Sequence, residues 1–116
     1  MGTNKILAQI VGVVLTLVGL AGFVSGGSLL GFQVNTLHNI VHLVSGLLGL
    51  YAGFAAGGQN AKMFNKTLGI IYVVVAVLGF ALPSTMFKLL AINMADNLLH
   101  LVLGAVLALV GYAVND

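Results

Sequence analysis

The chain has 116 residues, of which 60% are hydrophobic and only 5% are charged. Soluble domains carry about a quarter charged residues, so this composition excludes a soluble globular protein and predicts a surface that faces lipid. The small net charge of +2 excludes the clustered basic patch of a nucleic-acid-binding protein, and the absence of cysteine excludes disulfides, thiolate metal sites, iron–sulfur clusters and covalently attached haem.

Four apolar runs predict membrane-spanning helices, since each is close to the roughly 20 residues that cross a bilayer. They lie at residues 6–24, 37–56, 67–82 and 95–114. Short connections make successive helices antiparallel neighbours. We therefore expect an all-α integral membrane four-helix bundle with up-down-up-down topology. Because the first run looks like a copy of the third, we expect it to be a span and not a cleaved leader.

The connection after the third run begins with Pro83, which cannot continue a helix. The residues that follow mix Lys88 with apolar side chains, and Ser84 or Thr85 is a candidate helix cap. This pattern predicts a short helix that lies in the membrane interface, with Lys88 directed toward the head groups.

An internal repeat relates the two halves of the single domain, residues 1–116. Seven identities recur at an offset of 58 (93 − 35), and the first members of the pairs are Asn35, Asn39, His42, Leu43, Val44, Gly46 and Gly53. In the first helix of each half, Asn4 resembles Asn65 at an offset of 61 (65 − 4). The repeats are predicted at about residues 4–56 and 65–114. Two spans in each copy predict a pseudo-two-fold axis along the membrane normal.

The lysines predict the orientation of the bundle. With a cytoplasmic N-terminus, Lys5, Lys62 and Lys66 lie inside and only Lys88 lies outside. The positive-inside rule then favours a multi-pass protein of the cell membrane with both termini in the cytoplasm.

Polar residues gather at the predicted outer ends of the second and fourth helices. Asn35 and Asn93 are candidate N-caps, and His38, His42, Asp96 and His100 follow on one face of each helix because residues three or four apart are neighbours. Asn39 and Asn97 flank the histidines. Each face continues as a stripe of small residues that allows close helix packing, and its members are Gly46, Gly49, Gly53, Gly104, Ala108 and Gly111.

The doubled motif His-Asn-x-x-His-Leu and Asp-Asn-x-x-His-Leu carries a resemblance. The segments LHNIVHLVSGLLGL and NMADNLLHLVLGAVLALVG resemble the two motifs of a bacterial four-helix membrane family catalogued as domain of unknown function 4383. The resemblance covers nearly the whole chain. It implies four spans with short ends, and it implies no activity.

Several interpretations of the polar cluster remain open. Asn39, His42, Asn97 and His100 could form a closed hydrogen-bond network that fixes helix pairing, while Asp96 complements a helix dipole. Alternatively, His38, His42, Asp96 and His100 form a three-nitrogen, one-oxygen ligand set for Zn, Fe or Cu.

Two further interpretations involve haem or transport. His42 and His100 could hold a b-type haem, with Gly46 and Gly104 leaving room for the flat ring. The cluster could also serve a small proton or ion transporter, although little besides Gln9, Thr16 and Tyr72 would continue its polar path toward the inner half. Tyr72 is interpreted as a core side chain with a satisfied hydroxyl.

We expect a non-enzymatic structural or accessory membrane subunit first, and a metal-binding or haem-binding redox protein as the alternative. Its partners would be the lipid bilayer and either other membrane subunits or a second copy of the chain. No nucleic acid is expected.

Overall fold

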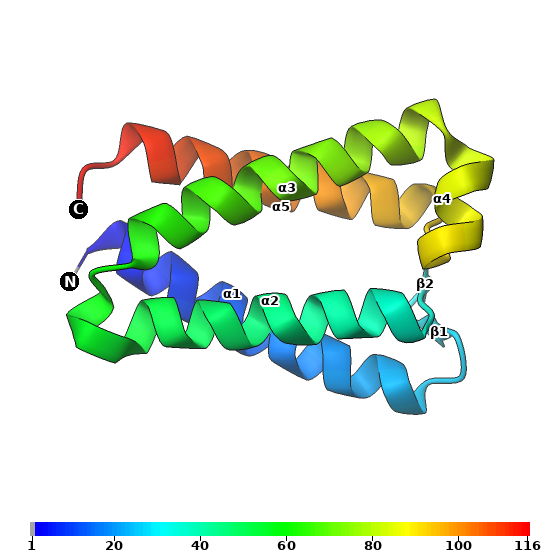
Figure 1. Ribbon diagram of the computed structural model, residues 1–116, viewed down its shortest axis with the longest axis horizontal. Helices are drawn as coiled ribbons and strands as arrows, with labels where there is room; N and C mark the ends of the chain where they lie inside the picture. The colour runs from blue at the N-terminus through cyan, green and yellow to red at the C-terminus, as the bar shows by residue number, and fades with distance from the viewer. Residues whose placement is uncertain (1) are drawn as a thin grey trace.

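Four long helices, one short helix and a small β-hairpin make up the computed structural model, which describes residues 2–116 (Figure 1). The long helices are α1 (Thr3–Val24), α2 (Thr36–Phe54), α3 (Ala61–Ala81) and α5 (Met94–Ala113). Successive long helices run in opposite directions, and both termini lie at one end of the bundle (Figure 1). The predicted all-α bundle is confirmed.

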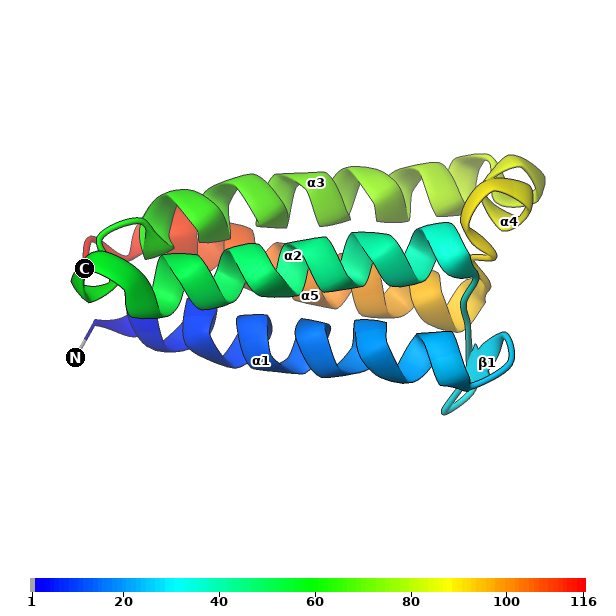
Figure 2. The ribbon, with the colours of Figure 1, turned by 60° about the horizontal axis from the view of Figure 1, so that its bottom comes forward.

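All four long helices are long and apolar enough to cross a membrane. The molecule measures 40 × 29 × 18 Å, with the helices running along the long axis (Figure 2). A bilayer is about 40–45 Å thick with its head groups, so the bundle matches its thickness. Large apolar side chains are exposed along every long helix, for example at Leu17, Leu48, Val77 and Leu109.

The end of the bundle that holds the two connections at residues 25–35 and 82–93 is called the connection end. The first connection forms a hairpin of β1 (Ser28–Leu29) and β2 (Phe32–Gln33), which was not predicted. Its turn residues Leu30 and Gly31 both have positive φ, 52° and 86°, as in the type I′ turns that suit the twist of a hairpin.

The second connection contains the predicted short helix, α4 (Pro83–Leu90), with Pro83 in its first turn. The sequence expectation of a Ser84 or Thr85 cap is wrong, because Leu82 is the N-cap residue and no side chain caps the helix. Proline is favoured at a first helical position because its fixed φ suits the helix and it needs no N–H acceptor there. Pro83 therefore ends one helix and starts the next.

Helix α3 begins at Ala61, six residues before the predicted start at residue 67 (67 − 61). Residues 61–66 mix polar and apolar side chains, so a search for continuous apolar runs missed this first part of the helix. A short 3-10 turn, η1 (Ala55–Gly58), joins α2 to α3.

Glycines bring the helices of each repeat into backbone contact. A Cβ atom on Gly12 of α1 would lie 2.5 Å from the backbone N of Leu50 in α2. A Cβ atom on Gly69 of α3 would likewise lie 2.5 Å from the backbone N of Ala108 in α5. The helices α1 and α2 pack closely, as do α3 and α5, whereas contacts between these two helix pairs are far fewer (Figure 1).

These contacts correct the alignment of the first helices of the repeat. Gly22 faces Asn39, and Gly79 faces Asn97, so equivalent positions in α1 and α3 are 57 residues apart (79 − 22). The offset of 61 suggested by Asn4 and Asn65 was wrong by about one helical turn. The second connection is therefore one residue longer than the first. Helical spacing repeats every 3.6 residues, so a shift of one turn leaves the apolar pattern almost unchanged and is hard to detect in sequence.

The end of the bundle with the two termini, called the terminal end, is joined by polar contacts. Asn65 Nδ2 donates to the backbone oxygen and to Oδ1 of Asn4, each at 3.0 Å. Asn4 and Asn65 therefore contact each other across the two repeats and are not equivalent positions. Asp116 Oδ1 accepts from the Thr3 backbone N–H at 3.0 Å, and this hydrogen bond holds the pKa of the Asp116 carboxyl below its usual range.

Candidate metal centre

Two asparagine caps set the depth of the polar residues at the connection end. Asn35 Oδ1 accepts from the His38 backbone N–H, and Asn93 Oδ1 accepts from the Asp96 backbone N–H, each at 2.9 Å. Both predicted N-caps are confirmed. His42 and His100 follow one helical turn deeper on α2 and α5, so they lie at similar depth on facing helices.

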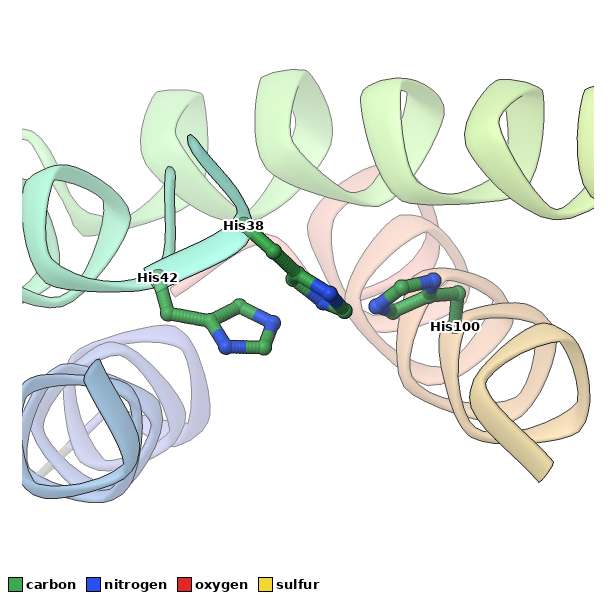
Figure 3. Close-up of side chains that lie close together, drawn as sticks. All are labelled: His38, His42 and His100. Carbon is green, nitrogen blue, oxygen red and sulfur yellow. The ribbon is translucent and has the colours of Figure 1, made fainter. Parts of the chain in front are cut away.

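The structure brings the three histidines together between α2 and α5. Figure 3 shows the His38 and His42 rings leaving α2 toward the bundle interior, where the His100 ring from α5 meets them. The ring centroids of His38 and His42 are 4.4 Å apart, and those of His42 and His100 are 6.0 Å apart. One nitrogen from each ring can be chosen so that all three lie within 4.8 Å of one another.

The histidine rings are buried, and several of their nitrogens have no well-formed hydrogen bond. His38, His42 and His100 are only 2%, 5% and 3% exposed. No partner is found for either nitrogen of His38, or for the Nδ1 atoms of His42 and His100. A buried polar atom without a partner costs about 1–3 kcal/mol. The three buried rings therefore hold nitrogens without a protein partner close to one another, an arrangement that could hold a metal ion.

Asp96 lies beside this cluster but its carboxylate is engaged elsewhere. Asp96 Oδ2 accepts from the backbone N–H of Asn93 at 2.9 Å and of Gln33 at 3.3 Å. The first contact completes a capping box at the start of α5, and the second holds β2 against that helix. The group of ligand atoms that converge contains the three histidines and not Asp96.

Replacing Asp96 by alanine should loosen the hairpin and lower stability. The substitution leaves the Asn93 and Gln33 N–H groups without their acceptor, and loss of a helix cap typically costs about 1 kcal/mol. Hydrogen exchange in detergent should show faster exchange at Gln33 and Asn93, with Leu98→Ala at an exposed position of the same helix as the control. Unchanged exchange at both amides would contradict this role for Asp96.

Asn39 and Asn97 point away from the histidines, toward the first helix of each repeat. A Cβ atom on Gly22 would lie 1.9 Å from Asn39 Oδ1, and one on Gly79 would lie 1.8 Å from Asn97 Oδ1. Both amide oxygens are buried without a hydrogen-bond partner, as are Nδ1 of His42 and of His100. These four atoms therefore make none of the bonds of the closed network considered for these side chains, and the asparagine amides pack against glycines.

The small-residue stripe lies where α1 meets α2 and where α3 meets α5. Its members Gly46, Gly49, Gly53, Gly104, Ala108 and Gly111 all lie close to backbone atoms of the opposite helix. Thr16 N would lie 2.3 Å from a Cβ atom on Gly46, and Val73 N would lie 2.7 Å from one on Gly104. The space expected to receive a haem ring beside these two glycines is thus filled by α1 and α3.

Tyr72 of α3 is a polar neighbour of the cluster that the sequence interpretation misjudged. Its ring centroid lies 5.4 Å from that of His100, and its buried hydroxyl lies near Ser45, so Tyr72 sits beside the cluster and not only in the inner half of the bundle. The corrected offset pairs Tyr72 with Leu15 of α1 (72 − 15 = 57). A polar group at a core position that is apolar in the other repeat is the signal that could have identified it.

A comparison of the sequence with protein families matches residues 5–113 to the one described as a domain of unknown function, DUF4383. No curated protein and no solved structure matches the chain.

Proposed function

We propose that this chain, which belongs to the family described as domain of unknown function 4383, is a membrane-embedded metal-binding protein with His38, His42 and His100 as ligands. The carrying observation is the convergence of one nitrogen from each buried ring within 4.8 Å. It favours the metal-binding alternative over a purely structural role, because unpartnered buried nitrogens do not by themselves stabilise helix pairing.

The ligand geometry supports a tetrahedral ion with one open position. Metal–imidazole bonds of about 2.0–2.1 Å place ligand nitrogens roughly 3.3 Å apart around a tetrahedral ion. Small rotations of the three rings would bring separations of up to 4.8 Å to that value. Three protein ligands then leave the fourth position for an exogenous molecule, as in catalytic metal sites.

The charge of the ligand set narrows the choice of ion. Three neutral imidazoles suit Zn, Cu or Fe, but they contribute no negative charge in a buried site. The cost of burying an ion rises steeply with its charge. The site therefore favours cuprous ion, or a divalent ion whose fourth ligand is an anion such as hydroxide. The Asp96 carboxylate lies nearby and partly balances either ion.

Replacing His42 by glutamine should abolish stoichiometric metal binding. The glutamine side chain keeps hydrogen-bonding groups but cannot ligate as imidazole does. Purified parent protein, incubated separately with cuprous and zinc ions and then desalted, should retain close to one ion per chain by elemental analysis. Ser45→Ala, one turn deeper on the same face of α2, is the matched control and should bind like the parent.

Binding should also weaken as the pH falls, since a protonated imidazole cannot ligate. If the parent protein and the Ser45→Ala variant retain no more metal than His42→Gln with every ion tested, the proposed metal site is wrong and the structural interpretation stands.

We also propose that the terminal end lies in the cytoplasm. Lys5, Lys62 and Lys66 lie toward that end and Lys88 lies on α4 at the connection end, which supports the orientation by the positive-inside rule. The cluster of histidines would then lie near the outer face of the cell membrane, with the exposed leucines and valines in lipid.

Cysteine labelling tests the orientation without background, because the chain has no cysteine. Ser28 and Gln59 are exposed at opposite ends of the bundle. In intact cells, Ser28→Cys should react with an impermeant maleimide, whereas Gln59→Cys should react only after lysis. Labelling of Gln59→Cys alone in intact cells would reverse the orientation.

A further inference from the structure

A small cavity touches the proposed metal site beneath the β-hairpin. Its volume is about 100 Å³, and its walls include Val18 of α1, Phe32 and Val34 of the hairpin connection, and Leu99 of α5. Two polar residues, His42 and Asp96, also line it. It is a partly enclosed space whose wall includes Leu30 and Leu99, which are exposed on the outside of the bundle, and His42, which is buried.

The lining of this cavity determines what it can hold. Asp96 Oδ2 is occupied by two backbone N–H groups, and almost all of the remaining wall is aliphatic or aromatic. A water molecule needs two to four polar partners to be held in a protein interior, and an apolar cavity of about 150 Å³ in another protein stays dry and binds benzene or xenon. A cavity of 100 Å³ with this lining therefore suits an apolar molecule of a few atoms.

We propose that this cavity delivers a neutral diatomic molecule, of the class of dioxygen, nitric oxide or carbon monoxide, to the open position of the metal. The inference rests on the proposed metal site, and it adds the class of ligand and the route. Apolar gases dissolve better in the hydrocarbon core of a bilayer than in water. A path lined by Val18 and Leu99 accordingly favours entry from lipid, while charged solutes and hydrated ions are excluded.

The hairpin that covers this cavity is present in the first repeat and is replaced by α4 in the second. The corrected offset pairs Val18 of α1 with Val75 of α3 (75 − 18 = 57). In that repeat the connection is the helix α4 instead of a hairpin. Gln33 N–H bonds to Asp96 Oδ2, and Asn93 Nδ2 bonds to the backbone oxygen of Gly31 at 3.2 Å. These two bonds hold the hairpin in place over the histidines, and the hairpin forms the outer wall of the cavity.

Carbon monoxide is a suitable probe because it binds cuprous ion and its stretching vibration is seen by infrared spectroscopy. The parent protein in detergent, loaded with cuprous ion without oxygen, should show a single C–O stretching band with carbon monoxide. Val18→Phe should fill the cavity and abolish the band while copper remains bound. Val75→Phe, at the equivalent position of the other repeat, is the matched control and should keep the band.

A second measurement tests the cavity without metal. Xenon added to the metal-free parent and to Val75→Phe should show an NMR shift that reports binding, and Val18→Phe should lose it. If copper is bound but the parent gives no C–O band, or if Val18→Phe keeps both signals while folded, the cavity does not deliver ligands and the metal site alone stands. If the parent binds no copper, the proposed function itself fails and the delivery role fails with it.

Discussion

Replacing Gly46 by leucine should separate α1 from α2 and cause the largest loss of stability of any single substitution proposed for this protein. A Cβ atom at this position would lie 2.3 Å from Thr16 N and 2.8 Å from the carbonyl carbon of Leu15. Both obstacles are backbone atoms of α1, which cannot rotate away as a side chain can. Over-packing costs about 1–3 kcal/mol and occasionally more, and we expect a value at or above the top of that range.

The free energy of unfolding can be measured by titration with a denaturing detergent in mixed micelles. Val44→Leu is the matched control, since it introduces the same side chain two residues earlier at a half-exposed position and should behave like the parent. Gly104→Leu should repeat the effect in the second repeat, where a Cβ atom would lie 2.7 Å from Val73 N. If both glycine variants unfolded like the parent, the close helix contacts would be wrong.

Metal should stabilise the folded protein strongly, and the effect should depend on His100. The three ligands come from both helix pairs, with His38 and His42 on α2 and His100 on α5. These pairs share few other contacts, so a bound ion joins the least supported interface of the bundle. A ligand that binds only the folded state raises the free energy of unfolding by about 2.7 kcal/mol when its free concentration is 100 times its dissociation constant.

The variant His100→Leu should be at least as stable as the parent without metal and less stable than the parent with metal. Without metal, leucine removes a buried ring nitrogen that has no partner, so the variant should be as stable as the parent or more stable. With zinc or cuprous ion in excess, only the parent should gain stability. Unfolding titrations with and without metal would show this crossover. An equal gain in both proteins would mean that the ion acts elsewhere.

The sequence was sufficient for features that depend on composition and on short-range spacing. Apolar runs of about the length that a bilayer requires, separated by short connections, predict the four long helices, and Pro83 followed by mixed polar and apolar residues predicts α4. The N-caps Asn35 and Asn93 follow from their position just before apolar segments, because a cap bonds to a backbone N–H only three residues away. The same spacing puts His38 and His42 on one face of α2.

Only the tertiary structure decided which groups these residues meet. The sequence placed Asp96 among the ligands, but the hairpin brings Gln33 N–H to its carboxylate. Asn39 and Asn97 were expected to bond to the histidines, yet each turns toward a glycine of the neighbouring helix.

The offset between α1 and α3 likewise became clear only from the contacts of Gly22 and Gly79. The physical reason is common to these cases: helical periodicity specifies the face of a residue, whereas its partner depends on how far one helix slides along another. A slide of one turn preserves the apolar pattern but exchanges every contact across the interface. The sequence by itself therefore determined the four long apolar helices, the N-caps Asn35 and Asn93, and the inward face of the histidines. The tertiary structure decided that three imidazoles, and not a network with asparagine, meet inside the bundle.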